Sequence, residues 1–91
     1  MAAPVYWYRG YPIFLSDKPD KKYYAVVRSV KSNRLNKIYF GDTSSYHYHD
    51  VIGYYKSLDH LDESRRKNFK SRQVYRNLVG SAAWFADKLL W

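Results

Sequence analysis

The sequence predicts a small α+β domain, with an antiparallel sheet of a β-hairpin plus one or two strands, one main helix and a C-terminal helical tail. Two β-branched and aromatic runs flank a polar connection, which is typical of a β-hairpin over residues 23–41. Residues that can cap helices precede two segments farther along the chain. Strand signals therefore come first and helix signals follow, which indicates an α+β fold.

The first run of the hairpin is YYAVVRSV and the second is KIYFGD, with Asn33 and Asn36 in the connection between them. Before the hairpin, Pro4 and Pro12 argue against a helix, and we expect short extended pieces around a turn at Gly10. After the hairpin, the segment TSSYHYHDVIGYYKS is expected to form either a third strand or an ordered loop.

The helical region has recognisable boundaries. Asp62 or Asp59 can cap a helix over residues 62–77, because a carboxylate at this position accepts hydrogen bonds from the free amide groups of the first turn. Gly80 is expected to end this helix. Ser81 is then placed to cap a short final helix, AAWFADKLLW.

A chain of 91 residues is expected to form one domain. We divide it into an extended arm (1–22), a hairpin and loop region (23–56) and a helical region (57–91). Its 46% hydrophobic content excludes an intrinsically disordered chain, and the absence of cysteine excludes a disulfide framework and a thiolate zinc site. The longest uncharged apolar run, residues 82–86, is far shorter than the ~20 residues that cross a bilayer, so we expect a soluble protein without a membrane span.

The formal net charge is +8, and residues 63–91 hold seven bases against two acids. Such a field attracts polyanions, chiefly nucleic acid, or an acidic protein surface. The alternative is a solvated helix face that only keeps the protein soluble. A nucleic-acid-binding module would use the bases of the hairpin and of the main helix around exposed tyrosines: Arg28, Lys31, Arg34, Lys37, Arg66, Lys67 and Lys70.

The chain contains eleven tyrosines, more than so small a core can enclose. Large rings and apolar side chains also gather near both ends of the sequence, and we expect them to insert into a neighbouring protein. The predicted interface residues are Tyr6, Trp7, Tyr8, Trp84, Phe85, Leu90 and Trp91.

Arginines share one face of the main helix with an aromatic residue. On a helical wheel at about 100° per residue, Arg65, Phe69 and Arg72 fall close together. Because burying an unpaired guanidinium group is prohibitive, we expect these arginines to pair with acids or to stack on tyrosines, in preference to contacting phosphate. The candidate acids are Asp42, Asp50 and Asp62.

The string HxDxxRxxxFxxR, formed here by His60, Asp62, Arg65, Phe69 and Arg72, resembles a motif of small, largely uncharacterised basic proteins of large DNA viruses and some phages. Those proteins have an FG pair and a tyrosine-containing loop before the motif and a tryptophan-rich tail after it. The corresponding residues in this chain are Phe40, Gly41, Tyr54, Tyr55, Trp84, Leu89, Leu90 and Trp91. The chain departs from them at Gln73, where a second His is common, and residues 1–22 have no counterpart.

The resemblance implies a viral origin and a shared fold but no established chemistry. We therefore expect an accessory structural protein of a virus particle, a minor capsid or capsid-associated protein that docks on other virion proteins as part of a larger assembly. It would be located in the virion, and in the host cell interior before assembly. The alternative is a basic nucleic-acid-binding module that packages or contacts viral DNA.

Catalytic and metal chemistry have weaker support. Zinc could lie between His47, His49 and His60 with Asp50 or Asp62, but metal sites more often show compact, paired spacings, and we expect His60 to bond the helix start or Asp62. There is no GxSxG elbow and no glycine-rich phosphate loop. We expect no enzyme and no cofactor, and the remaining catalytic alternative is a nuclease that uses His60 with Asp59 or Asp62.

Overall fold

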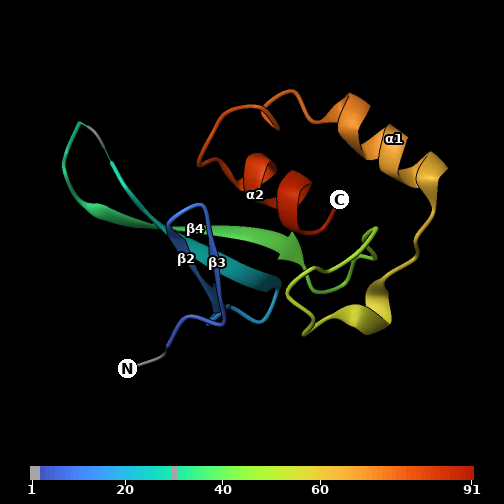
Figure 1. Ribbon diagram of the computed structural model, residues 1–91, viewed down its shortest axis with the longest axis horizontal. Helices are drawn as coiled ribbons and strands as arrows, with labels where there is room; N and C mark the ends of the chain where they lie inside the picture. The colour runs from blue at the N-terminus through green and yellow to red at the C-terminus, as the bar shows by residue number, and fades with distance from the viewer. Residues whose placement is uncertain (1–2, 30) are drawn as a thin grey trace.

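The computed structural model describes residues 3–29 and 31–91, and these residues form four strands, one 3-10 turn and two α-helices (Figure 1). The α+β class predicted from the sequence is confirmed. The elements in chain order are β1 (Tyr6–Tyr8), β2 (Tyr11–Leu15), β3 (Lys21–Arg28), β4 (Leu35–Asp42), η1 (Lys56–Leu58), α1 (Glu63–Arg72) and α2 (Ala82–Leu89).

The strands form one antiparallel sheet in chain order, so that each strand pairs with the next through a short connection. The first connection turns at Arg9 and Gly10, which both have positive φ, as expected for the turn at Gly10. The β3–β4 hairpin pairs Tyr23 with Phe40 and confirms the predicted hairpin over residues 23–41. Its connection includes Asn33 in the left-handed region, with φ 55°.

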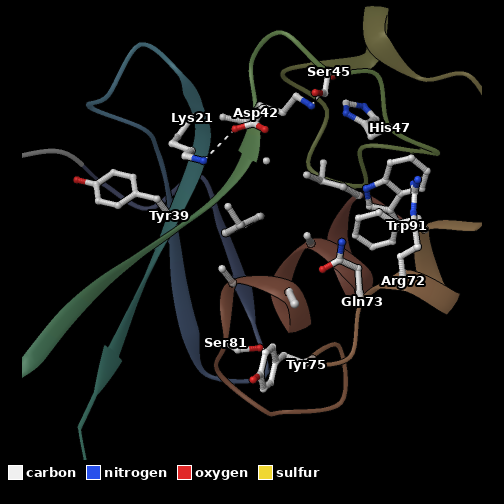
Figure 2. Close-up of a pocket in the computed structure, with 18 of the residues that line it drawn as sticks. Lys21, Tyr39, Asp42, Ser45, His47, Arg72, Gln73, Tyr75, Ser81 and Trp91 are labelled. Carbon is white, nitrogen blue, oxygen red and sulfur yellow. Dashed lines mark hydrogen bonds and ion pairs between the residues drawn. The ribbon is translucent and has the colours of Figure 1, made fainter.

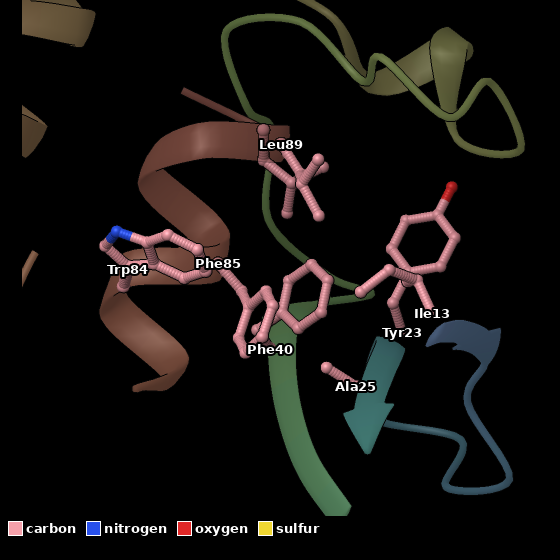
Figure 3. Packing of buried hydrophobic residues seen from close by; sticks show 8 residues of the cluster. Ile13, Tyr23, Ala25, Phe40, Trp84, Phe85 and Leu89 are labelled. Atoms are coloured by element: carbon pink, nitrogen blue, oxygen red, sulfur yellow. The ribbon is translucent and has the colours of Figure 1, made fainter. Parts of the chain in front are cut away.

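One face of the sheet packs against α2 (Figure 3). Ile13 of β2 lies opposite Ala25 of β3, and both are fully buried. The Phe85 ring of α2 stacks on Phe40 of β4 with centroids 5.5 Å apart. Ser81 caps α2 as predicted, because its side chain accepts a hydrogen bond from the Trp84 amide. The core therefore forms between the sheet and the last helix.

The C-terminal rings belong to this core, which corrects the expectation that they insert into a neighbouring protein. Trp84, Phe85 and Leu90 are buried within the same chain, and Trp91 packs partly buried against them. The physical reason is that α2 lies on the sheet, so its apolar side chains fill the space that the strand residues leave. Near the N-terminus, Tyr6 and Tyr8 are also half-buried against the core.

Trp7 differs from its neighbours Tyr6 and Tyr8. It lies in the short strand β1 with 63% of its surface exposed, because alternate strand residues point to opposite faces of the sheet. Of the predicted interface residues, Trp7 is the one large ring that the structure presents to solvent.

Helix α1 begins as predicted and ends earlier. The Asp62 carboxylate accepts hydrogen bonds from the amides of Ser64 and Arg65, so Asp62 is the cap. The helix stops at Arg72 rather than at residue 77, because the following segment contains Val, Tyr and Asn, which favour helices weakly. Residues 73–80 form turns instead, and Gly80 adopts φ 86° immediately before the cap of α2.

Residues 43–60 form an ordered loop closed by η1, the second of the two predicted possibilities. The buried Asp50 carboxylate organises the loop, accepting hydrogen bonds from the Tyr23 hydroxyl at 2.6 Å and the Tyr55 amide at 2.8 Å. Asp59 accepts from the Asp50 amide at 2.8 Å. In the described ranges, no helix is long and apolar enough to cross a membrane.

Candidate functional site

The residues of the HxDxxRxxxFxxR motif converge on Trp91. Phe69 of α1 stacks on the Trp91 indole with centroids 4.3 Å apart and planes 5° apart. The His60 ring lies on the same residue, with its centroid 5.2 Å from the indole. Asp62 caps α1 between them, so the spacing of the motif places one helix and one imidazole around a single indole.

His60 is held as a neutral ring by its hydrogen bond. Its Nδ1 accepts from the Asp62 amide at 2.9 Å, so the proton of the neutral ring is on Nε2, which has no hydrogen-bond partner in the described residues. Burial lowers the pKa of His60, and the nearby Arg65 lowers it further. The predicted contact of His60 with the helix start is therefore present.

A cavity of about 390 Å³ opens beside the motif. Its lining is polar and cationic, and no Asp or Glu among the described residues contributes to it. The Arg65 Nε lies 4.0 Å from Asp62, and the described part of the chain offers the Arg72 side chain no ion pair or hydrogen bond. The lining residues are Ser44, Ser45, Tyr46, His60, Arg65, Asn68, Arg72 and Trp91.

A second cavity of about 700 Å³ adjoins the first (Figure 2). It lies between the end of β4, the end of α1 and the residues that lead into α2. Both cavities share Ser45, Tyr46, Arg72 and Trp91 in their lining, so they are neighbours, and we call the two together the C-terminal groove. Tyr75, from the turn segment between the helices, lines its wider part.

The wall of the groove depends on two neighbouring residues of the hairpin. Lys22 is 1% exposed, and its Nζ donates to the Ser45 carbonyl at 2.8 Å. Burial lowers the pKa of Lys22. Gly41 has φ 78°, and a Cβ there would lie 2.8 Å from Leu90 Cδ1. The FG pair of the sequence therefore corresponds to a position where glycine is required by both conformation and space.

The expectation that Arg65 and Arg72 pair with acids holds only for a weak contact of Arg65. Asp42 bonds Lys21 at 2.9 Å and Asp50 bonds Tyr23, and in the described residues neither forms an ion pair with an arginine. The helical wheel placed the arginines with Phe69 correctly but could not show that Phe69 would meet Trp91 at the helix surface. The guanidinium groups consequently lie in the groove and are exposed, not buried.

The seven bases predicted to bind nucleic acid do not form one site. Figure 1 places the turn of the β3–β4 hairpin and α1 at opposite ends of the molecule, whose longest extent is 39 Å. Arg66 donates to the Trp91 carbonyl at 2.7 Å, and Lys70 bonds the buried Asp87 at 2.7 Å. Both side chains therefore hold the fold together.

Two bases of the hairpin are also bonded within the fold, and two are exposed. Lys37 bonds Asp17 at 3.0 Å, and Arg28 donates to the Asn33 carbonyl at 3.1 Å. Lys31 and Arg34 are exposed at the hairpin turn, as is Lys67 on α1. For these last three, the described residues provide no ion pair.

Sequence reasoning missed the loop residues of the groove. Ser44 and Tyr46 carry no motif, and their positions follow from the folding of residues 43–60 around Asp50 and Asp59, whereas Asn68 lies on α1. Tyr75 lies in a turn, although the predicted helix over residues 62–77 includes it. For Ser44 and Tyr46, the signal that could have found them is the polar string TSSY, which follows the FG pair after Asp42.

The two histidines of the loop form hydrogen bonds within the fold. His47 and His49 each bond one oxygen of Asp59. Burial lowers the pKa of His47, and the nearby Lys22 adds to this effect. In residues 3–29 and 31–91, no group of three or more His, Cys, Asp and Glu side chains is arranged to hold a metal ion.

Comparison with known proteins finds no matching family model, no matching curated protein and no matching solved structure. The viral resemblance of the motif therefore stays a prediction.

Proposed function

We propose that this protein binds nucleic acid through the C-terminal groove, with Arg65 and Arg72 as the phosphate-contacting residues. The observation that carries the proposal is the pair of guanidinium groups that line one cavity to which no described carboxylate contributes. Like charges that share a concave surface repel each other, and a bound anion removes this repulsion. Guanidinium groups bind phosphate oxygens through two parallel hydrogen bonds, which suits them to this ligand.

The long-range field supports a polyanion rather than a single small anion. The net charge of +8 attracts any polymer of phosphates. The groove provides arginine side chains that can contact the phosphates directly. Ser44 and Asn68 lie in the same lining and can donate hydrogen bonds to phosphate or sugar oxygens. Nucleic acid meets both requirements, since it repeats phosphate groups along its length.

The proposal is tested by fluorescence anisotropy with a labelled oligonucleotide of about 15 nucleotides at several salt concentrations. We expect the double variant R65A/R72A to bind about tenfold more weakly or worse, and the slope of log K against log salt to fall by about 1 to 2. The matched control is K31A/R34A, which removes the same charge from the hairpin turn and should leave most of the affinity.

Equal losses in the two double variants would show that binding follows net charge rather than the groove, and would contradict the proposal. Absence of binding at low salt would also contradict it. Tighter binding of a polyglutamate peptide than of the oligonucleotide would assign the groove to an acidic protein instead.

A second candidate function is docking on a capsid protein, the role that the viral resemblance implies. The turn segment 73–80 favours it, because Val74, Leu78 and Val79 are exposed within a few residues of one another. The triple variant V74S/L78S/V79S should then be absent from purified particles that retain the unsubstituted protein. Retention of the variant at the same level would exclude this surface as the docking site.

A further inference from the structure

We infer that the C-terminal groove selects an unpaired strand over a duplex, with Tyr46 and Tyr75 as stacking platforms for bases; this inference rests on the proposed nucleic-acid function. Tyr46 is 59% exposed and Tyr75 is 65% exposed. Both line the groove. Solvent-exposed rings combined with a positively charged groove are the means by which many proteins bind single strands.

These two rings are exposed and do not stack on another ring, unlike most other tyrosines of the described residues. In the described residues, neither Tyr46 nor Tyr75 takes part in a ring pair or lies under a cation. By contrast, the Tyr39 ring lies 4.3 Å from Lys18 Nζ, and Phe14 stacks on Tyr24 at 5.0 Å. A base can therefore stack in the groove without displacing a contact of the fold.

Arg72 lies between the two parts of the groove. It lines the same cavity as Tyr75 and both cavities with Tyr46, so a phosphate on Arg72 would have an exposed ring within the same depression. Figure 2 shows Gln73 between Arg72 and Tyr75, so the two side chains line different parts of the same cavity. A cation and an exposed ring in one cavity can hold a phosphate and a base of the same strand.

The size and shape of the groove also favour an unpaired strand. Its two parts, about 390 and 700 Å³, fall within the range of about 300–1,000 Å³ that is typical of pockets for small molecules. An unstacked base can enter a depression of this kind. Bases in a duplex are stacked on both faces and paired at their edges, so a duplex could offer only its phosphates to Arg65 and Arg72.

The experiment compares a single-stranded oligonucleotide with a duplex of the same sequence and length, using fluorescence anisotropy at one fixed salt concentration. We expect the single strand to bind about tenfold more tightly. We also expect Tyr46→Ala to weaken single-strand binding about fivefold to hundredfold, which corresponds to the loss of one stacked base, and to leave duplex binding unchanged. Tyr75→Ala should have the same selective effect.

Tyr54→Ala is the matched control, because Tyr54 is 58% exposed and does not line either cavity. Near-native circular dichroism of all three variants confirms that the comparison concerns binding. Equal affinity for single strand and duplex, or equal effects of Y46A and Y54A, would overturn the inference. The proposed function would survive that outcome if R65A/R72A still weakened binding, and both would fail if neither oligonucleotide bound.

Discussion

Phe69 and Trp91 stack with centroids 4.3 Å apart and planes 5° apart, which joins α1 to the end of the chain. None of the ten residues of α1, all of them described, is buried, so the helix has no apolar face of its own in the core. The Trp91 carbonyl also accepts a hydrogen bond from Arg66 at 2.7 Å. The position of Arg65 and Arg72 in the groove therefore depends on contacts outside the helix, among them those with Trp91 and the ion pair of Lys70 with Asp87.

Substitution Phe69→Ala should destabilise the protein by about 2 kcal/mol, less than the 3–5 kcal/mol of a fully buried phenylalanine because the ring is partly exposed. Urea denaturation followed by circular dichroism measures the change. Phe69→Tyr, which keeps a stacking ring, is the control and should cost less than half as much. A loss below about 0.5 kcal/mol for Phe69→Ala would show that the stack does not hold α1 in place.

Substitution Gly41→Ala should cost about 2 kcal/mol or more, since alanine strongly disfavours φ 78° and its Cβ would lie 2.8 Å from Leu90 Cδ1. Thermal unfolding checks this expectation. Gly10→Ala is the matched control for strain alone, because Gly10 also has positive φ but has no atom within 4 Å of the added Cβ. Equal losses at both positions would mean that the contact with Leu90 adds nothing.

Substitution Lys70→Met should destabilise the fold by about 1–3 kcal/mol, because it leaves the buried Asp87 carboxylate with only the weaker contact to Lys88 at 3.4 Å. Lys67→Met on the same helix removes an exposed lysine and should change stability by less than about 0.5 kcal/mol. Chemical denaturation of both variants decides the point. A neutral Lys70→Met variant would contradict a role for the pair in attaching α1 to α2.

Stability should fall as the pH is lowered from about 7 to about 5.5. Burial lowers the pKa values of His47 and His60 below the usual 6.5, so in this range the unfolded chain binds protons that the folded chain excludes. Urea denaturation at several pH values gives the free energy of unfolding and its dependence on pH. His60→Gln should make this dependence weaker. A stability that is constant or rises on acidification would show that neither imidazole is neutral in the fold.

Local signals account for what the sequence predicted well. The β-branched runs of the hairpin, the cap at Asp62 and the cap at Ser81 each depend on a few neighbouring residues, and all three appear in the structure. The motif residues were also identified from the sequence, and they do come together. Their meeting point at Trp91 lies about twenty residues beyond the motif, and no local pattern specifies it.

Long-range packing accounts for what could not be predicted. The burial of Trp84 requires that α2 lie on the sheet, which the periodicity of eight residues does not reveal. The acids that bond Lys70 and Lys37 lie 17 and 20 residues away in the sequence. The sequence alone therefore could not distinguish the exposed bases from those with an ion-pair partner. Tyr46 lies in the groove because its loop folds around Asp50 and Asp59.

The most direct test of the groove is an NMR titration of the isotope-labelled protein with a single-stranded oligonucleotide. Binding in the groove predicts that the Trp91 indole N–H and the Arg72 side-chain resonances shift first and saturate together, while the amides of Lys31 and Arg34 stay unchanged. Shifts confined to the hairpin turn, or spread evenly over all exposed bases, would contradict the assignment of the groove as the nucleic-acid site.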